Sequence, residues 1–516
     1  MNGSPPAEHT AAVSPFTALS AWLLPATTLL IHLATYSGYG YFRDELYYLA
    51  NAEHLGFGYV EHPPLIGVIA WLVRATLGDS LFAIRLLPAV AAALTVWLTQ
   101  ATAGELGGGR FARVLAGLSA MLAPAFLGLF GLFSMNAFDL LFWAALWWIA
   151  ARCLRTGNDR LWLAFGVVAG VGLENKISVL FLGFGLVAGF VVSRRWDAFR
   201  NRWLWIGGAV AGLLFLPHVV WQAANGWPTL EFMRNAMARK NVALSPAAFL
   251  GAQAINTFGT LPVWLAGLVF LLVARAARPF RPLGWAFLAV LAVMLSTNAK
   301  PYYFVPAFVA PFAAGGVALE RAGKGRLGWA VRAAAVVFVI AGGIVAAPVA
   351  KAILPENAYV RYAQAIGVAP PQEERQALGR LPQMFADMHG WRELAEAVAG
   401  VYRQLPREEQ ARACVLAGNY GQAGAIDLFG PPLGLPKAIS GHNSYFLWGP
   451  RDCSGEVMIV LGSSREDLAM DYVSVQLGST FTCKDCMPYE NDKPIWIARG
   501  LKVPMSVAWP GMKNYI

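Results

Sequence analysis

The sequence predicts a polytopic, all-α membrane protein with a soluble α/β domain at its C-terminal end. Of its 516 residues, 57% are hydrophobic and only 14% are charged, whereas a soluble domain of average composition carries roughly 25% charged residues. Long apolar segments recur up to residue 350, and about 20 consecutive apolar residues cross a bilayer. Beyond residue 351 the chain becomes mixed in polarity and rich in turns. We therefore expect a transmembrane domain over residues 1–350 and a soluble domain over residues 351–516.

About eleven segments are apolar enough to be predicted as membrane spans. The first follows a polar N-terminus without a charged region and lacks a small-residue cleavage site, so we expect a retained span and not a signal peptide. The segment 64–78 is too short to cross and contains Arg74, which predicts a helix lying in the membrane interface. The predicted spans are 17–36, 82–103, 112–130, 136–152, 160–173, 178–193, 203–221, 250–273, 283–297, 303–319 and 332–350.

Basic residues gather in every second loop, which predicts that those loops are cytoplasmic. The net charge of +10 has the same explanation and gives no reason to expect a nucleic-acid partner. With eleven spans, the N-terminus lies inside and the C-terminal domain lies outside. The outward segments are then 37–80, 131–136, 174–177, 222–249 and 298–302.

Four of the five cysteines lie in the outward domain, where an oxidising environment favours disulfides. Cys483 and Cys486 form a CxxC motif, which is compatible with a redox-active pair or with half of a zinc site. A second CxxC motif is absent from the sequence, so a structural disulfide is the better prediction. Its pairing among Cys414, Cys453, Cys483 and Cys486 stays open.

The first outward loop, 37–80, carries two groups of ionisable residues. Asp44 and Glu45 stand among aromatic residues, where partial desolvation suits a carboxylate to act as a general base. The alternative is a solvated interfacial helix in which Arg43 pairs with these acids. Glu61 and His62 precede two prolines, which hold the backbone in a fixed direction.

The other short outward loops also carry polar side chains. Asp139 lies near the start of a span, where the helix dipole alone would favour an acid, and Lys176 can bind a phosphate or pair with Glu174. The loops together offer carboxylates for a base, cations for an anion and tyrosines at headgroup depth. This inventory suits a reaction on a lipid-linked phosphate. Its members beyond the first loop are Asn136, Asp139, Lys176, Lys300, Tyr302 and Tyr303.

These motifs resemble those of bacterial GT-C glycosyltransferases of family 39, the protein mannosyltransferase-like and aminoarabinose transferase-like membrane enzymes. The resemblance covers about residues 17–320, and the chain layout continues into the C-terminal domain. The motifs that carry it are Asp44-Glu45, Glu61-His62-Pro63-Pro64-Leu65, Asn136 to Asp139, and Lys300-Pro301-Tyr302-Tyr303.

The resemblance implies an inverting transfer of a sugar from a polyprenyl-phosphate carrier to an envelope lipid, glycan or protein hydroxyl. The reaction would take place at the outer face of the bacterial inner membrane, with the C-terminal domain in the periplasm. Asp44 would be the base, Glu45 its helper or the base itself, and Asp139 a second acid near the acceptor. The lipid-linked sugar is the donor substrate, and no residue cluster with metal-ligand spacing supports a divalent ion.

The donor phosphate would lie near Lys300, Tyr302 and Tyr303 by the same resemblance. Aminoarabinose transferases carry Lys where this chain has His62, a weaker and pH-dependent cation. We infer that Lys176 supplies the missing charge. The predicted site is completed by Arg43, Glu61 and Asn136.

A transporter or lipid flippase is the alternative, since it would also need charges near the membrane. Such proteins show internal repeats or helices broken at mid-membrane, and the sequence shows neither clearly. The polar segments 419–422 and 441–443 of the outer domain are compatible with acceptor contact, although ordinary turns have the same composition. The sugar, the acceptor and the oligomeric state stay open.

Overall fold

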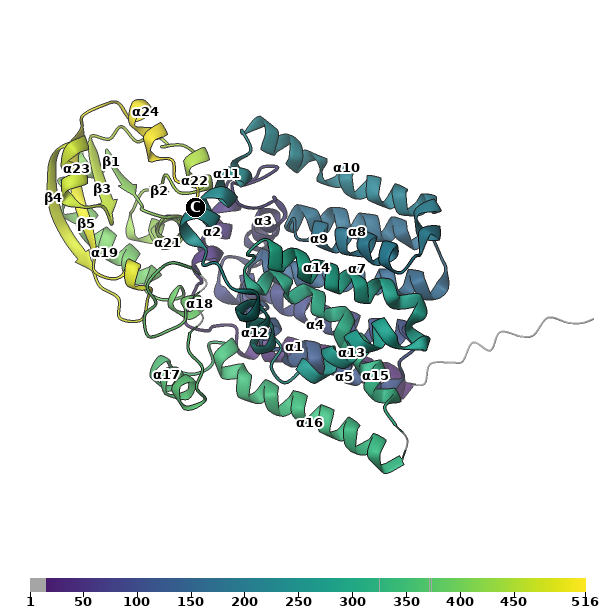
Figure 1. The fold of residues 1–516 in the computed structure, drawn as a ribbon. Coiled ribbons are helices and arrows are strands. Elements are labelled where there is room, and N and C mark those ends of the chain that lie inside the picture. The colour runs from purple at the N-terminus through teal and green to yellow at the C-terminus, as the bar shows by residue number, and fades with distance from the viewer. Residues whose placement is uncertain (1–14, 324, 371, 373) are drawn as a thin grey trace, which may run out of the picture.

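The computed structural model describes residues 15–323, 325–370, 372 and 374–516. A helical bundle forms one part of the molecule, and a five-stranded sheet with its own helices forms the other (Figure 1). The longer bundle helices are α1 (Pro15–Ala34), α3 (Leu65–Leu77), α4 (Leu81–Glu105), α5 (Arg110–Leu122), α7 (Met135–Thr156), α8 (Leu161–Asn175), α9 (Val179–Val192), α10 (Arg202–Ala224), α12 (Pro246–Asn256), α13 (Leu261–Val273), α14 (Arg281–Ser296), α15 (Val309–Arg321) and α16 (Gly325–Ala350).

Short helices connect or cap these. They are α2 (Arg43–Asn51), α6 (Pro124–Leu129), η1 (Trp196–Arg200), α11 (Pro228–Asn235), η2 (Ala236–Lys240), η3 (Arg275–Phe280) and η4 (Pro301–Phe308). The C-terminal part contains α17 (Glu356–Ala365), α18 (Gln383–Ala386), α19 (Trp391–Gln404), α20 (Arg407–Gln410), α21 (Tyr420–Phe429), η5 (Pro431–Leu433), α22 (Ser444–Leu447), α23 (Arg465–Asp471), η6 (Pro488–Glu490), α24 (Met505–Ala508) and η7 (Trp509–Met512).

Each of the eleven predicted spans contains a helix, but the count of eleven is not confirmed. Six helical segments of the described chain are long and apolar enough to cross a membrane, or seven if the bent pair of α12 and α13 is one span. That pair bends by 112°. Pro124 divides the predicted span 112–130, because a proline cannot continue the hydrogen bonding of α5. Four further helices are apolar but shorter.

The bundle helices approach one another closely at glycines. A Cβ atom on Gly166 of α8 would lie 2.1 Å from the carbonyl oxygen of Gly207 in α10, so neither position tolerates a side chain. Gly267 of α13 and Gly315 of α15 make the same kind of contact with the opposite backbone. Small residues at such crossings are how helices pack where lipid removes the hydrophobic driving force.

The sheet of the C-terminal part has the strand order β2-β1-β3-β5-β4. Its strands are β1 (Ala413–Leu416), β2 (Ala438–Ile439), β3 (Val457–Leu461), β4 (Tyr472–Phe481) and β5 (Lys493–Leu501). β1 runs parallel to β2 and β3, whereas β5 runs antiparallel to β3 and β4. β3 is buried along its whole length, as expected for a central strand.

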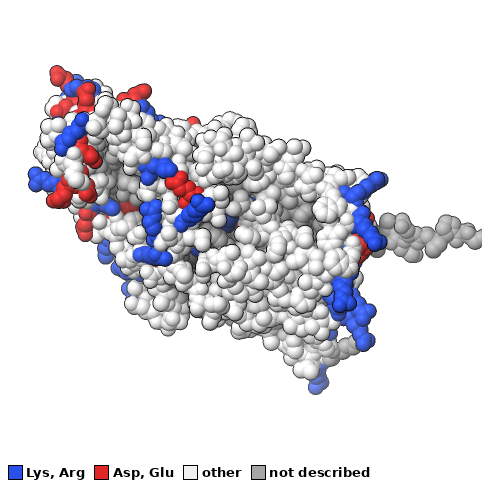
Figure 2. Space-filling model, turned by 45° about the horizontal axis from the view of Figure 1, so that its top comes forward, with Lys and Arg blue, Asp and Glu red and all other residues white. Residues whose placement is uncertain are grey.

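Helix α2 lies at the junction of the two parts and belongs to both cores. Tyr48 and Leu49 pack into the bundle core, whereas Leu46 and Tyr47 pack into the core of the C-terminal part, beside Ile426 of α21. Figure 2 shows a broad uncharged surface between the charged C-terminal part and a group of Lys and Arg at the far end of the bundle. Helix α2, which carries the predicted first-loop acids, thus lies where the bundle meets the C-terminal part.

Candidate active site

Asp44 stands in the first turn of α2. Its Oδ1 atom accepts a hydrogen bond from the Tyr420 hydroxyl at 2.7 Å, and its side chain stays partly exposed. Tyr420 begins α21, where the Asn419 side chain caps the helix by accepting from the backbone N–H groups of Gly421 and Gln422. A capped helix of the C-terminal part thus presents a donor to the carboxylate that the sequence predicts as the base.

The buried Arg43 guanidinium lies beside this pair. It donates to the Tyr420 hydroxyl at 3.0 Å and to the Tyr489 hydroxyl, and it lies 4.0 Å from a carboxylate oxygen of Asp387. Burial raises the pKa of Asp387 to about 6, and the Arg43 charge acts in the opposite direction. Arg43 therefore links α2 to three side chains of the C-terminal part.

Glu45 points to other partners. Arg85 of α4 donates to both carboxylate oxygens, at 2.8 Å and 2.7 Å, and the backbone N–H groups of Phe42 and Phe133 also donate to them. The carboxylate is fully buried. Its acceptor positions are already filled, so the geometry does not favour the expected role of Glu45 as helper or alternative base.

Glu61 lies close to α2. Its Oε2 accepts from the Tyr47 hydroxyl at 3.2 Å. Burial raises the pKa of Glu61 to about 8; the hydrogen bonds from Tyr47 and Asn443 oppose the rise, and the Asp44 charge adds to it. The side chain is therefore mostly protonated at neutral pH and can donate as well as accept a hydrogen bond.

His62 is buried and does not provide the expected cation. Its Nδ1 donates to the Pro63 carbonyl at 2.8 Å, and its Nε2 accepts from the Asn51 side chain at 3.1 Å. Burial lowers the pKa of His62 to about 4, so the ring is neutral at physiological pH. The geometry thus argues against a role for His62 in binding the donor phosphate.

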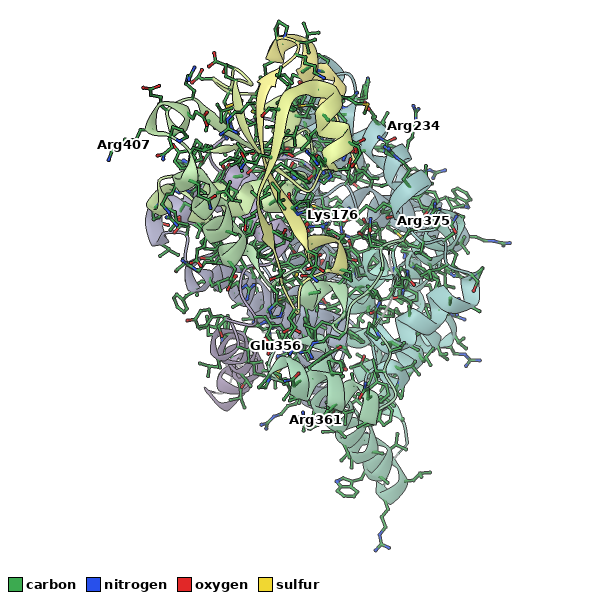
Figure 3. All side chains as sticks on the ribbon, turned by 90° about the vertical axis from the view of Figure 1, so that its left-hand side faces the viewer. Lys176, Arg234, Glu356, Arg361, Arg375 and Arg407 are labelled. Atoms are coloured by element: carbon green, nitrogen blue, oxygen red, sulfur yellow. A yellow bond between two sulfur atoms is a disulfide. The ribbon has the colours of Figure 1, made fainter. Side chains whose placement is uncertain are left out.

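Lys176 brings several predicted residues together. Its Nζ donates to Asn136 Oδ1 at 2.8 Å and lies 3.6 Å from Asp139 Oδ2. The same ammonium lies 4.6 Å from the centre of the Tyr303 ring and 5.8 Å from that of Tyr302. In a view along the bundle, Lys176 lies near the centre of the molecule (Figure 3). Residues from three of the loops that the sequence predicts to face outward therefore meet around one cation.

Lys300 belongs to a second cationic group. Its Nζ donates to Glu374 Oε1 at 2.7 Å, and Lys240 lies 3.7 Å from the same oxygen. Burial alone would raise the pKa of Glu374, but the two lysines outweigh it and lower the pKa to about 2. The Asp44 and Arg43 charges also influence the pKa of Lys240, so this group lies within electrostatic range of α2.

Tyr48 lies between the acidic residues of the first loop and the tyrosines of η4. Burial raises the pKa of its phenol, and the Asp44 and Glu61 carboxylates and the Tyr303 phenol add to the rise. Groups from the first outward loop and from η4 are therefore close enough to influence the same hydroxyl. The site forms one neighbourhood around α2.

Five residues of this neighbourhood were not predicted as site residues: Lys240, Glu374, Asp387, Tyr420 and Tyr489. The polar segment 419–422 gave a signal for Tyr420, but its composition is also typical of turns. The contacts of the other four depend on the tertiary fold, so the local sequence contains no signal for them.

The cysteines divide into one bonded pair and three free thiols. Cys414 and Cys453 form a disulfide, which confirms the prediction of a disulfide among the outer four. Cys153, Cys483 and Cys486 are free. In the described part of the chain, no group of three or more His, Cys, Asp or Glu residues could hold a metal ion.

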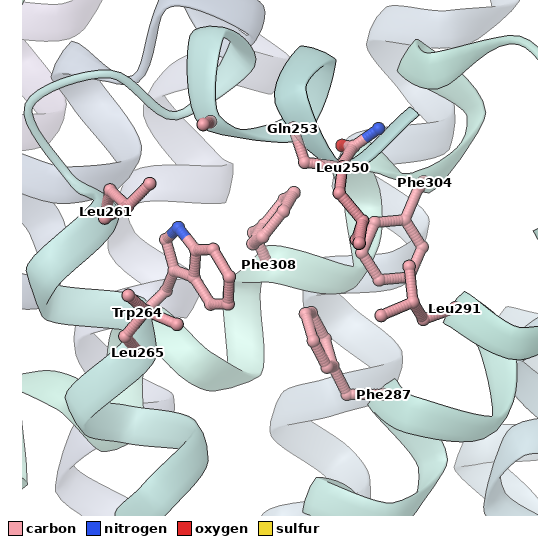
Figure 4. A pocket seen from close by; sticks show the side chains of 10 residues that line it. Leu250, Gln253, Leu261, Trp264, Leu265, Phe287, Leu291, Phe304 and Phe308 are labelled. Atoms are coloured by element: carbon pink, nitrogen blue, oxygen red, sulfur yellow. The ribbon is translucent and has the colours of Figure 1, made fainter. Parts of the chain in front are cut away.

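An apolar cavity of about 190 Å³ lies beside η4 (Figure 4). It is lined by residues of α12, α13, α14 and η4, including Trp264, Phe287 and Phe304. The Gln253 side chain on its wall donates to the Pro301 carbonyl at 3.0 Å. The cavity therefore adjoins the segment that carries Lys300.

Residues 61–221 match the family model of dolichyl-phosphate-mannose-protein mannosyltransferases. The chain is also similar to the crystal structure of ArnT from Cupriavidus metallidurans bound to undecaprenyl phosphate. The TM-score is 0.62 at 14% identity, with 94% of this chain and 98% of that chain covered. The apo state of the same protein gives a TM-score of 0.59 at 16% identity, with 93% and 98% covered.

No curated protein sequence matches the chain at a significant level. At these identities the structural likeness concerns the fold. The family match over residues 61–221 and the fold shared along nearly the whole chain confirm the predicted resemblance to the GT-C membrane glycosyltransferases of family 39 type.

Proposed function

We propose that the protein is an inverting glycosyltransferase that moves a sugar from a polyprenyl-phosphate carrier to a hydroxyl of an envelope lipid, glycan or protein. The observation that carries this proposal is the position of Asp44. Its partly exposed carboxylate is fixed by Tyr420, and the same neighbourhood contains the cationic groups of Lys176 and Lys300. A base and a phosphate site are the two parts that such a transfer needs.

The proposed step is a single displacement at the anomeric carbon. The acceptor oxygen forms the new bond and gives its proton to Asp44. The bond between the anomeric carbon and the phosphate oxygen breaks on the opposite face, and its electron pair leaves with the polyprenyl phosphate. Asp139 and Asn136 both lie on α7 and both contact Lys176, and Asp139 would hold a hydroxyl of one of the two substrates there.

Two lysine groups would balance the charge of the leaving phosphate. Lys176 stands beside Tyr302 and Tyr303, and it supplies the cation that the buried, neutral His62 cannot provide. Lys300 and Lys240 share Glu374, so this triad carries one net positive charge. Positive charge fixed where negative charge develops lowers the barrier of the step.

The apolar cavity beside η4 would accept part of the isoprenoid chain of the carrier. Apart from Gln253, its lining is aromatic and aliphatic, and the adjoining Lys300 would hold the phosphate at its outer end. The structure of ArnT with bound undecaprenyl phosphate supports a carrier of this class.

We also propose that the site faces the periplasm. The Lys and Arg residues at the far end of the bundle (Figure 2) are typical of a cytoplasmic face. The C-terminal domain and the candidate site around α2 would then lie on the outer side of the inner membrane.

A mass-spectrometric comparison of envelope lipids and glycoproteins from cells with and without the protein tests the proposal. We expect one class of envelope molecule to gain the mass of a sugar only when the protein is present, which would also identify donor and acceptor. An unchanged envelope in cells that contain the folded protein in the membrane would contradict the proposed function.

A further inference from the structure

The connection between β4 and β5 carries two free thiols and two contacts to the candidate site. Cys483 and Cys486 lie in its first half. Tyr489 and Glu490 follow in η6. The connection is therefore a short covalent path from a pair of thiols to the surroundings of Arg43.

The two thiols are unequal in environment. Cys483 is partly exposed and Cys486 is buried. The Cys486 sulfur lies 3.1 Å from the Cys483 carbonyl oxygen, so the intervening residues turn back on themselves. A hydrogen bond between the thiols lowers the pKa of Cys483 and raises that of Cys486. Thiol–disulfide exchange uses an accessible thiol that attacks and a second, less accessible thiol that resolves the mixed disulfide. Cys483 and Cys486 have these two environments.

The structural disulfide is separate from this pair. Cys414 lies on β1 and Cys453 lies shortly before β3, so their disulfide is within the sheet region. The bonded pair accounts for two of the four outer cysteines, and the CxxC pair has no bonded partner elsewhere in the described chain. The thiols of the CxxC pair are thus available for chemistry that the fold itself does not use.

We propose that Cys483 and Cys486 form a reversible dithiol–disulfide site that reacts with a disulfide of a small molecule or protein. The Cys483 thiolate attacks one sulfur of that disulfide and releases the first thiolate. Cys486 loses its proton to solvent and attacks the Cys483 sulfur, which releases the second thiolate. The protein loses two electrons and two protons, and the external disulfide is reduced to two thiols.

The redox state of this pair reaches the site through η6. The Tyr489 hydroxyl receives a hydrogen bond from Arg43 and donates to Asp387. The Glu490 carboxylate accepts from the side chains of Asn419, at 2.7 Å, and Gln422, at 2.6 Å. Asn419 caps the helix that begins with Tyr420. Formation of the disulfide would therefore change the conformation of the loop that contacts Arg43 and the helix of Tyr420, whose hydroxyl donates to Asp44. An effect on transfer rests on the proposed function.

Redox equilibration of the purified full-length protein tests the site itself. The protein is equilibrated with defined ratios of reduced and oxidised glutathione, quenched in acid, alkylated and digested with trypsin. Cleavage after Lys484 separates the two cysteines, so only the disulfide form gives a linked pair of peptides. We expect this linked pair to disappear under milder reducing conditions than the bond between Cys414 and Cys453.

A linked pair that never forms, or that is reduced only together with Cys414–Cys453, would overturn the proposal. Replacement of Cys483 and Cys486 by Ser in one variant provides the matched control, which must give separate peptides throughout.

Transfer activity tests the coupling to the site. Oxidation of Cys483 and Cys486 in the wild type is expected to change the transfer rate about fivefold or more. The same treatment should leave the rate of the double Ser variant unchanged. An equal response of both proteins would refute the coupling. If Asp44→Asn retains transfer, the proposed base fails instead, and the glutathione experiment still decides on the thiol pair.

Discussion

Asp44 and Glu45 are adjacent in the sequence, but the fold gives their carboxylates different surroundings. Asp44 stays partly exposed and meets a phenol of the C-terminal part, whereas Glu45 is enclosed by Arg85 and two backbone donors. A carboxylate with filled acceptor positions and a fixed charge partner is poorly suited to take a proton. The geometry therefore favours Asp44 as the base and Glu45 as a structural link.

Replacement of Glu45 by Gln is expected to destabilise the protein by about 3–5 kcal/mol, because it leaves Arg85 buried without its charge partner. The measurement is thermal unfolding in detergent, with Asp44→Asn as the control that should unfold close to the wild-type temperature. Equal unfolding temperatures of Glu45→Gln and wild type would contradict the structural role.

Replacement of Tyr420 by Phe removes the hydroxyl that holds Asp44. We expect kcat to fall about 10- to 100-fold, the value of one hydrogen bond to a charged group, with little change in the KM for the donor. Tyr402→Phe is the matched control, since the Tyr402 hydroxyl bonds the Gln410 carbonyl within the C-terminal part. A loss in both variants would mean that the effect is not specific to Asp44.

Glu61 makes the stability depend on pH. The folded state keeps its proton up to a pKa of about 8, whereas the unfolded chain releases it near the ordinary value of 4.5. Between these values the folded state binds more protons, so this group makes stability fall as pH rises. The unfolding temperature of Glu61→Gln relative to that of the wild type is expected to rise from pH 5 to pH 8 and to stay constant above pH 8. A constant difference across this range would contradict the raised pKa.

At the scale of elements, Glu374 joins the segment after α17 to two loops that the sequence predicts to face outward. Its carboxylate bonds Lys300 before η4 and lies near Lys240 of η2. Arg375 continues the contact by donating through its backbone N–H to the Lys240 carbonyl. Separate loops of the chain are thus held together by one buried carboxylate.

Replacement of Glu374 by Gln is expected to lower stability at pH 7 by about 1–3 kcal/mol and to expose these loops to trypsin. The folded pKa of about 2 lies below the unfolded value of 4.5, so the stabilisation is present above pH 4.5 and is lost as pH falls towards 2. The difference from wild type should therefore shrink on acidification.

Glu456→Gln is the control for this variant, because its pair with Arg412 is exposed and contributes about 0–1 kcal/mol. A Glu374→Gln variant as stable and as resistant to trypsin as this control would count against the loop link.

At the scale of the whole molecule, the sequence predicted the membrane class, the positions of the apolar helices and the change to a region with a sheet near the C-terminal end. These follow from apolar length and from basic residues in alternate loops, which are local properties. The number of spans could not be predicted as well, because breaks such as the 112° bend between α12 and α13 depend on how the helices pack.

The site was predictable in its outward-loop residues and not in those of the C-terminal part. Asn136, Asp139, Lys176 and Tyr303 lie together because short loops keep them at one end of the bundle, and their roles stay predictions. Tyr420 reaches Asp44 across a sequence separation of 376 residues. No local sequence pattern predicts such a contact. At His62 the local motif is misleading, because it suggests a cation, whereas burial keeps the ring neutral.

The most direct test of the account is envelope mass spectrometry of cells that produce the wild type, Asp44→Asn or Asp79→Asn. Asp79 lies in the same outward loop but has an exposed carboxylate 3.7 Å from Arg74, so it controls for the loss of an acid there. We expect the added sugar with the wild type and with Asp79→Asn, and a loss of about 100-fold or more with Asp44→Asn. Normal sugar addition by a folded, membrane-inserted Asp44→Asn variant would contradict this expectation.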